Sequence, residues 1–129
     1  MYGSTFKLSG YQQSSTRVRF SGTWRTVTDS RHWGGSLRSS TQTAAKSTFS
    51  FTGRQFAWVA QTGPTWGSAR VYVNGLRVAT VNLAALSPGR RQVVFSMAWS
   101  RSATRTVVIQ VSGTAGHPKV GVDGFLVAS

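Results

Sequence analysis

The side chains that most enzymes use for acid–base chemistry are scarce in this sequence. Asp29 and Asp123 are its two acids, His32 and His117 are its two histidines, and it has no cysteine. Glycoside hydrolysis usually needs a pair of carboxylates, and a serine nucleophile needs a histidine that an acid orients. Neither arrangement is visible. The sequence therefore predicts no catalytic residue, and four scattered ligands predict no metal site.

Basic side chains dominate instead. Fifteen Lys and Arg residues face two acids, for a formal net charge of +13. Such a charge attracts polyanions over long range, and the planar guanidinium fork suits carboxylate, sulfate or phosphate groups. No nucleic-acid recognition motif is present, so any binding to nucleic acid would rest on charge and weaken with salt.

Three tryptophans lie in or beside stretches that are expected to be loops. Trp33 precedes two glycines, Trp66 lies between Gly-Pro-Thr and another glycine, and Trp99 precedes a serine- and arginine-containing stretch. An exposed indole can stack on the apolar face of a sugar ring. The alternative is a ring folded back over the end of a small core. Trp99 favours this alternative because it keeps the parity of Phe95 and Met97.

The ligand-binding candidates combine these rings with nearby basic side chains. Two arginines share the outward face of a predicted hairpin with a tyrosine, and another arginine follows Trp99. The candidates are Trp66, Trp33, Trp99, Tyr72, Arg70, Arg77 and Arg101.

The sequence predicts that the elements which position these side chains are β-strands. No helical period is sustained, and short runs rich in Val, Thr and aromatic residues are separated by Gly, Pro, Ser and Asn. This pattern is typical of an antiparallel sandwich or barrel. We expect a single domain over 1–129, in which 1–16 is a loosely ordered or added N-terminal strand. The predicted strands are 17–28, 36–40, 47–52, 55–61, 68–73, 76–83, 90–98, 105–112 and 119–127.

The Asn74-Gly75 pair predicts a hairpin with a two-residue turn. Its register places one set of partners on a core face and the other, with Tyr72, on an open face. The expected pairs are Val73 with Leu76, Tyr72 with Arg77, Val71 with Val78 and Arg70 with Ala79, the first and third being core. Alternation also predicts core positions at Phe49, Phe51, Val93, Phe95, Met97, Val107, Ile109 and Val111.

Strands that alternate in direction would sort the loops to two ends. The 29–35 loop, with Trp33, is expected beside the Gly53-Arg54 turn and the 99–104 loop. The Trp66 loop is expected at the other end, together with the 113–118 loop that contains His117.

The run STFSFTGRQFAWVAQTGPTWGSARVYVNGLRVATVNL resembles jelly-roll modules of the galactose-binding-like superfamily, which occur in secreted proteins of high-GC bacteria. The stretches GTWRTVTDSRHWGGSLRSS and VVIQVSGTAGHPKVGVDGFLV resemble the opening and closing strands of these carbohydrate-binding-module-like domains. The resemblance implies an antiparallel β-sandwich (jelly roll) of about eight or nine strands. It also implies an extracellular accessory role, often in sugar binding.

Two departures bear on cofactors. Asn74 and Asn82 stand where the family usually has the acids of VYVDG and VDL. These departures argue against calcium held through carboxylates, and no cofactor is expected.

Together these observations predict a non-catalytic carbohydrate-binding module for acidic polysaccharide or an anionic cell-wall glycan. Two alternatives stay open: a basic domain that binds nucleic acid or another polyanion through charge, and a structural or adhesive module without a small ligand. No apolar run approaches the roughly 20 residues that span a bilayer, so no membrane insertion is expected. The N-terminus also lacks the apolar core of a signal peptide.

Overall fold

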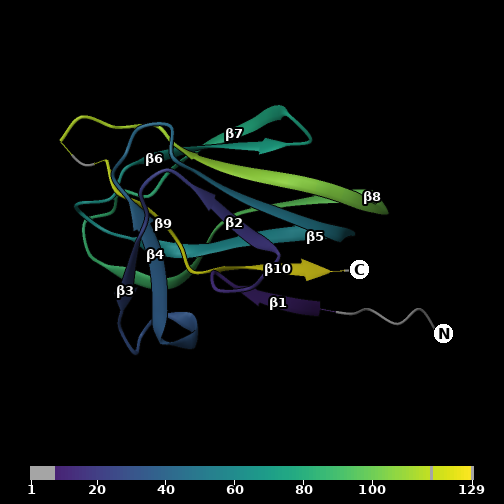
Figure 1. Cartoon of the computed structure of the whole chain (residues 1–129), viewed down its shortest axis with the longest axis horizontal. Coiled ribbons are helices and arrows are strands. Elements are labelled where there is room, and N and C mark those ends of the chain that lie inside the picture. Colours follow the sequence, from purple (N-terminus) through teal and green to yellow (C-terminus); the bar gives the residue numbers. More distant parts are fainter. Residues whose placement is uncertain (1–7, 117, 129) are drawn as a thin grey trace.

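A computed structural model describes residues 8–116 and 118–128, and within them it contains ten strands, one short 3-10 turn and no α-helix (Figure 1). No helix in this part of the chain could cross a membrane. His117, predicted in the 113–118 loop, lies outside the described residues. The elements are β1 (Leu8–Gln12), β2 (Val18–Ser21), β3 (Arg25–Thr28), η1 (Trp33–Gly35), β4 (Ser36–Ser40), β5 (Lys46–Thr62), β6 (Ser68–Val73), β7 (Leu76–Asn82), β8 (Gly89–Val111), β9 (Val120–Val122) and β10 (Gly124–Ala128).

The two longest strands, β5 and β8, bend together at a corner. They pair antiparallel, but their register shifts after Gly53, and residues 99–102 of β8 leave the ladder there. The ring centroids of Phe51 and Phe56 are 5.7 Å apart. In a straight strand, five residues would separate them by roughly 17 Å and place them on opposite faces. Both strands therefore fold back on themselves, as Figure 1 shows.

This corner turns one hydrogen-bonded sheet into the two layers of a sandwich. The upper layer in Figure 1 holds β2, residues 46–53 of β5, residues 103–111 of β8, β6 and β7. The lower layer holds β1, β10, residues 55–62 of β5 and residues 89–98 of β8. A separate three-stranded sheet, β3-β4-β9, lies at the left of the molecule. The chain crosses from this sheet to the lower layer at the buried Asp123.

Aromatic rings from both layers meet in the core. Phe49 of the upper layer stacks on Phe125 of the lower layer with centroids 4.4 Å apart, and Trp58 is fully buried beside them. Burying rings of this size stabilises each by several kcal/mol, on the order of 25 cal/mol per Å² of apolar surface. The antiparallel β-sandwich that the sequence predicted is confirmed, as are the core positions Phe49, Phe51, Val107, Ile109 and Val111.

Three other predicted core positions, Leu76, Val78 and Val93, are wrong. Leu76 is 73% exposed and Val78 is 36% exposed, because β7 is the last strand of the upper layer and pairs only with β6. The predicted register holds at the turn but slips by one residue after Tyr72, so that Val71 faces Ala79. Val93 is 56% exposed, and Phe95 and Met97 are half-buried against the core.

The turn between β6 and β7 is as predicted and is also tied to β8. Asn74 and Gly75 both have positive φ, 50° and 84°, as a tight hairpin turn requires. The Asn74 N–H donates to the Thr106 carbonyl (2.9 Å), and the Asn74 Oδ1 accepts from the Thr106 N–H (3.0 Å). Asn74 therefore joins the turn to the neighbouring strand.

The predicted strand 17–28 is two strands. Gly22, with φ of +87°, separates β2 from β3, and the chain reverses once more than expected. The 29–35 loop consequently lies at the start of β8, where Arg91 Nη2 donates to the His32 carbonyl at 3.1 Å. The prediction that this loop shares an end with the Gly53-Arg54 turn is wrong for that reason. At the N-terminus, Leu8–Gln12 forms strand β1 against β10.

Candidate ligand-binding face

The outer surface of the upper layer is a regular polar face. Strand alternation turns Phe49 and Phe51 into the core and leaves Thr48 and Ser50 on the outside. Side chains of five neighbouring strands meet on this outer surface in cross-strand rows, with strands roughly 4.8 Å apart. Such rows bring together residues that are distant in the sequence.

Two of these rows carry the basic side chains. We call their six larger polar members the basic face: Arg19, Lys46, Arg70, Tyr72, Arg77 and Gln110. The first row runs Ser21, Lys46, Gln110, Arg70 and Thr80; the second runs Arg19, Thr48, Val108, Tyr72 and Arg77.

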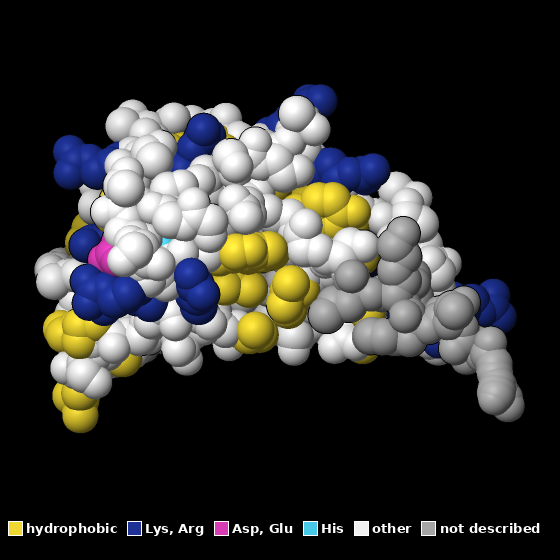
Figure 2. Space-filling model, turned by 90° about the horizontal axis from the view of Figure 1, so that it is seen from below, with side chains coloured by type: hydrophobic (Ala, Val, Ile, Leu, Met, Phe, Trp, Pro, Cys, Tyr) yellow, Lys and Arg dark blue, Asp and Glu magenta, His cyan; other side chains and the backbone are white. Residues whose placement is uncertain are grey.

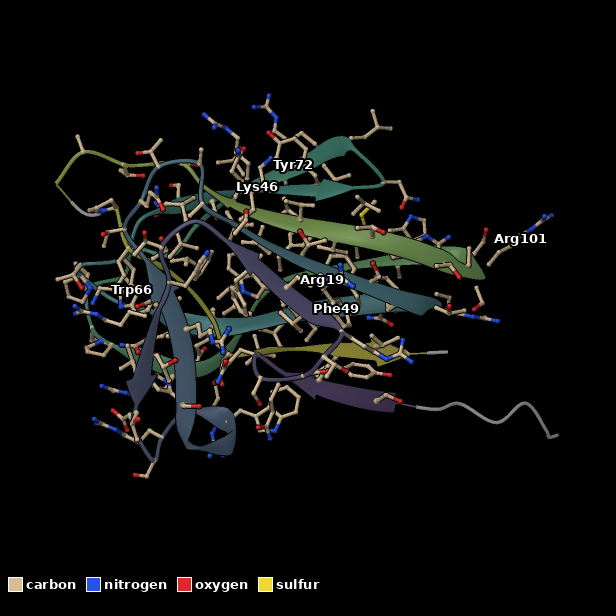
Figure 3. The ribbon with its side chains drawn as sticks, viewed as in Figure 1. Arg19, Lys46, Phe49, Trp66, Tyr72 and Arg101 are labelled. Carbon is tan, nitrogen blue, oxygen red and sulfur yellow. The ribbon has the colours of Figure 1, made fainter. Side chains whose placement is uncertain are left out.

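Tyr72 and Gln110 lie at the centre of the basic face. The Tyr72 hydroxyl donates to Gln110 Oε1 at 3.2 Å, and both side chains are half-buried. A hollow of about 320 Å³ lies beside them and is also lined by Lys46, Gly75 and Val108. Figure 3 shows Tyr72 and Lys46 at the upper layer, with Arg19 below them. An aromatic ring, an amide and one cation, Lys46, thus line one open hollow.

Neither acid of the chain lies on this face. Asp29 pairs with Arg31 (2.8 Å) and Arg90 (3.5 Å), and the hydrogen bonds from Arg31 hold the pKa of that carboxyl well below its usual range. Asp123 is fully buried, and its burial raises its pKa to about 6, although the Trp33 N–H donates to Asp123 Oδ2 at 2.9 Å. Among residues 8–116 and 118–128, the four cations of the basic face therefore have no carboxylate partner.

Hydroxyl groups continue the face toward the corner. Ser50 and Thr106 lie opposite each other with their oxygens 3.2 Å apart, and Thr52 and Thr104 form the next pair at 2.8 Å. These four side chains offer hydrogen bonds without charge between the basic face and the corner.

The structure brings together three of the predicted site residues, Arg70, Tyr72 and Arg77, and separates the other four. Sequence reasoning missed Arg19, Lys46 and Gln110. The alternation of side chains along a strand could have placed each of them on the outward face of its own strand. Their proximity to Tyr72 depends on pairings of β2, β5, β8 and β6, which no local pattern specifies.

Trp66 is a core residue. Only 3% of it is exposed, and its ring lies against the positions of Gly63 and Gly121. The Lys119 ammonium covers the ring at 4.9 Å from its centroid. The expectation of an exposed stacking platform is wrong, because Gly121 lacks the side chain that would exclude the indole from the interior.

Trp99 caps the corner between the layers. Its ring packs at 6.0 Å from Phe56, and the Arg105 guanidinium lies 4.1 Å from its centroid. Arg105 also donates to the Gly53 carbonyl at 2.6 Å, which ties the cap to the bend in β5. Arg101 is exposed at the tip of this corner, at the right of Figure 3.

Trp33 lies on the outer side of the lower layer. Its six-membered ring lies over Gly10 and Gly124, where an added Cβ would come within 2.6 Å of ring carbons, and the side chain is half-buried. Figure 2 shows this lower side, where hydrophobic side chains gather in the middle between basic ones. Trp33 is therefore a partly exposed ring at the surface, in contrast to Trp66.

Calcium fits these residues poorly. Across 8–116 and 118–128, no group of three or more His, Asp or Glu side chains could hold a metal ion. Asp29 is engaged by two arginines, and Asp123 stands alone in its buried position. Calcium prefers six to eight oxygen ligands, several of them carboxylates.

No protein-family model matches this sequence, and no curated protein matches it either. Solved structures do. The CBM36-1 domain of a multidomain xylanase from the hindgut metagenome of Trinervitermes trinervoides matches with a TM-score of 0.62 and 12% identity, over 95% of this chain and 97% of that one.

Parts of larger proteins match as well. A family two carbohydrate esterase from Cellvibrio japonicus gives a TM-score of 0.68 at 12% identity, over 97% of this chain. The Agl-KA catalytic domain gives 0.61 at 16% identity, over 98%. This chain spans only 34% and 28% of those two chains. At such identities the likeness shows the fold, an antiparallel β-sandwich, and nothing of the ligand.

Proposed function

We propose that this protein is a non-catalytic, extracellular carbohydrate-binding module whose basic face binds acidic polysaccharide or an anionic cell-wall glycan. One observation carries the proposal. Arg19, Lys46, Arg70 and Arg77 surround Tyr72 and Gln110 on a single regular face, to which the described part of the chain contributes no carboxylate.

The chemistry of the face suits a sugar acid. A guanidinium can hold a carboxylate or sulfate through two parallel hydrogen bonds. The Tyr72 ring offers an apolar surface beside the hollow, and Gln110 offers an amide to sugar hydroxyls. The β-sandwich likeness to the CBM36-1 domain is consistent with this role and stands on fold alone.

Binding to polygalacturonate, measured by affinity electrophoresis and calorimetry, tests the proposal. The double variant R70Q/R77Q removes two charges from the basic face. R54Q/R101Q is the matched control, because it removes two exposed charges at the corner. We expect R70Q/R77Q and Tyr72→Ala each to weaken binding roughly tenfold, since about 1.4 kcal/mol corresponds to that factor. The control should stay within about twofold of the unchanged protein.

Three results would contradict the proposal. Equal losses in both double variants would indicate binding by net charge alone. Equal affinity for single-stranded DNA, with a steep fall between low and physiological salt, would favour the polyanion alternative. Loss of glycan binding in Trp33→Ala with R70Q/R77Q unaffected would move the site to the lower layer.

A further inference from the structure

A second hollow, of about 300 Å³, lies where β3 and β4 approach the segment before β9. We call it the Lys119 hollow. It is lined by Thr23, Arg25, Val27, Ser39, Ser40, Thr41 and Lys119.

Two cations from different segments face this hollow. Lys119 is held in place by the ring of Trp66, which lies 4.9 Å from its ammonium nitrogen. Arg25, on β3, stands opposite Ser39 of β4. Both ion pairs among the described residues involve Asp29, and Asp123 is buried under the Trp33 loop. The two charges therefore share a hollow in which no described carboxylate compensates them.

Hydrogen-bonding groups complete the lining. The Ser40 hydroxyl donates to the Thr23 carbonyl at 2.6 Å and accepts from the Gln42 N–H at 3.1 Å, which fixes the wall between these strands. Ser39 also lines the hollow and is only 6% exposed. One largely enclosed hydroxyl thus lies beside two cations.

We propose that the Lys119 hollow binds a compact oxyanion, such as the carboxylate of a sugar acid or a free sulfate. Arg25 and Lys119 would supply the charge, and Ser39 would supply a neutral hydrogen bond. The volume is at the lower end for ligand pockets, which suits one small group and not a polymer segment. The ring of Trp66 contacts Lys119 of this hollow, and Trp66 is well separated from Tyr72 in Figure 3. The Lys119 hollow is therefore a separate site from the basic face.

Amide NMR titrations with galacturonate, galactose and sodium sulfate test this inference. We expect galacturonate, sulfate or both to shift the amides of Arg25, Ser39 and Lys119 and the indole N–H of Trp66 in a saturable way, while galactose does not. A response to galacturonate alone identifies the ligand as a sugar acid. Comparable responses to both anions identify a site for any compact oxyanion. No response at these residues, or an equal response to galactose, would overturn the proposal.

A variant pair adds a second criterion. R25Q/K119M removes both charges and keeps the methylene stem on Trp66, and R54Q/R101Q is again the charge-matched control. We expect R25Q/K119M to weaken anion binding at least tenfold, with the control unchanged. R70Q/R77Q should leave this site intact, so failure here is distinguishable from failure of the proposed function. Anion binding that is unchanged in R25Q/K119M would contradict the inference.

Discussion

Trp33 and Trp66 look alike in the sequence and differ in the structure. Each precedes a glycine, and each ring lies against a glycine of a distant segment: Gly10 and Gly124 for Trp33, and Gly121 for Trp66, whose ring also contacts Gly63 of its own loop. Yet Trp66 is 3% exposed and Trp33 is half-buried on the outside of the lower layer.

The difference lies in which side of a strand the facing glycine occupies. Gly121 opens toward the interior, where Leu37 also packs, and Gly124 opens outward three residues later. The crossing from β9 to β10 at Asp123 separates these two positions. Glycines next to a tryptophan in sequence therefore say little about its exposure, whereas the glycine across from its ring decides it.

The largest expected effect tests this contrast directly. Trp66→Ala should lower the free energy of unfolding by about 3–5 kcal/mol, because it leaves a cavity in the core. Trp33→Ala should cost less than about 2 kcal/mol, since part of that ring is already exposed to water and its removal leaves no closed cavity. Urea denaturation followed by circular dichroism measures both, and equal losses would refute the distinction between the two rings.

We expect the free energy of unfolding to depend on pH through groups beside Trp33, above all through the carboxyl group of Asp123. The pKa of Asp123 is raised from 3.8 to about 6, so its protonated form favours the folded state. Its contribution is present in full below pH 4 and is lost as the pH rises to about 6, on the order of 3 kcal/mol in total.

Asp123→Asn should remove this slope while keeping an acceptor for the Trp33 N–H. Burial lowers the pKa of His32, which gives an opposite trend in the same pH range. The quantity to measure is therefore the difference in free energy of unfolding between the unchanged protein and Asp123→Asn, because the contribution of His32 is common to both. Denaturation from pH 4 to pH 7 gives this difference. A difference that does not change with pH would contradict the assignment to Asp123.

The facing glycines give the next effect. An alanine Cβ at Gly121 would lie 2.7 Å from Trp66 and 3.0 Å from Leu37, so Gly121→Ala should cost about 1–3 kcal/mol. Gly10→Ala would crowd only the Trp33 ring at 2.6 Å, and this surface ring can move outward. We expect Gly10→Ala to cost under about 1 kcal/mol, as thermal denaturation would show, and to change the NMR signals of Trp33. A larger cost at Gly10 than at Gly121 would reverse the comparison.

The smallest effect concerns the cation above Trp66. Lys119→Met keeps the hydrocarbon stem but removes the charge over the ring, which should cost roughly 0.5–1 kcal/mol in urea denaturation. Arg17→Met is a control of the same chemistry, because that guanidinium lies 5.5 Å from the Tyr11 ring at an exposed site. A loss above about 2 kcal/mol for Lys119→Met would mean that Lys119 supports the core beyond this contact.

Much of the fold was predictable because its signals are local. The Asn74-Gly75 turn follows from the positive φ values that a tight hairpin needs, and alternation around Phe49 and Ile109 follows from the two-residue strand period. The exposed Leu76 was not predictable in this way. Its burial depends on whether another element covers β7, and none of the described elements does.

The candidate site was predictable only in part. Arg70, Tyr72 and Arg77 belong to one hairpin, so local register placed them together. Gln110 joins them through its pairing with Arg70, forty residues away in the chain, and Lys46 joins them through its pairing with Gln110, sixty-four residues away. Local propensity carries no information about such partners.

By itself, the sequence determined the β-strand architecture, the central hairpin, the excess of positive charge and the lack of paired acids, because these depend on composition, period and turn chemistry. Only the tertiary structure decided which charges adjoin and which tryptophan is buried. Charge clusters arise from non-local strand pairing, and the burial of Trp66 depends on Gly121, which lies fifty-five positions further along the chain and becomes its neighbour only when the sheets pack.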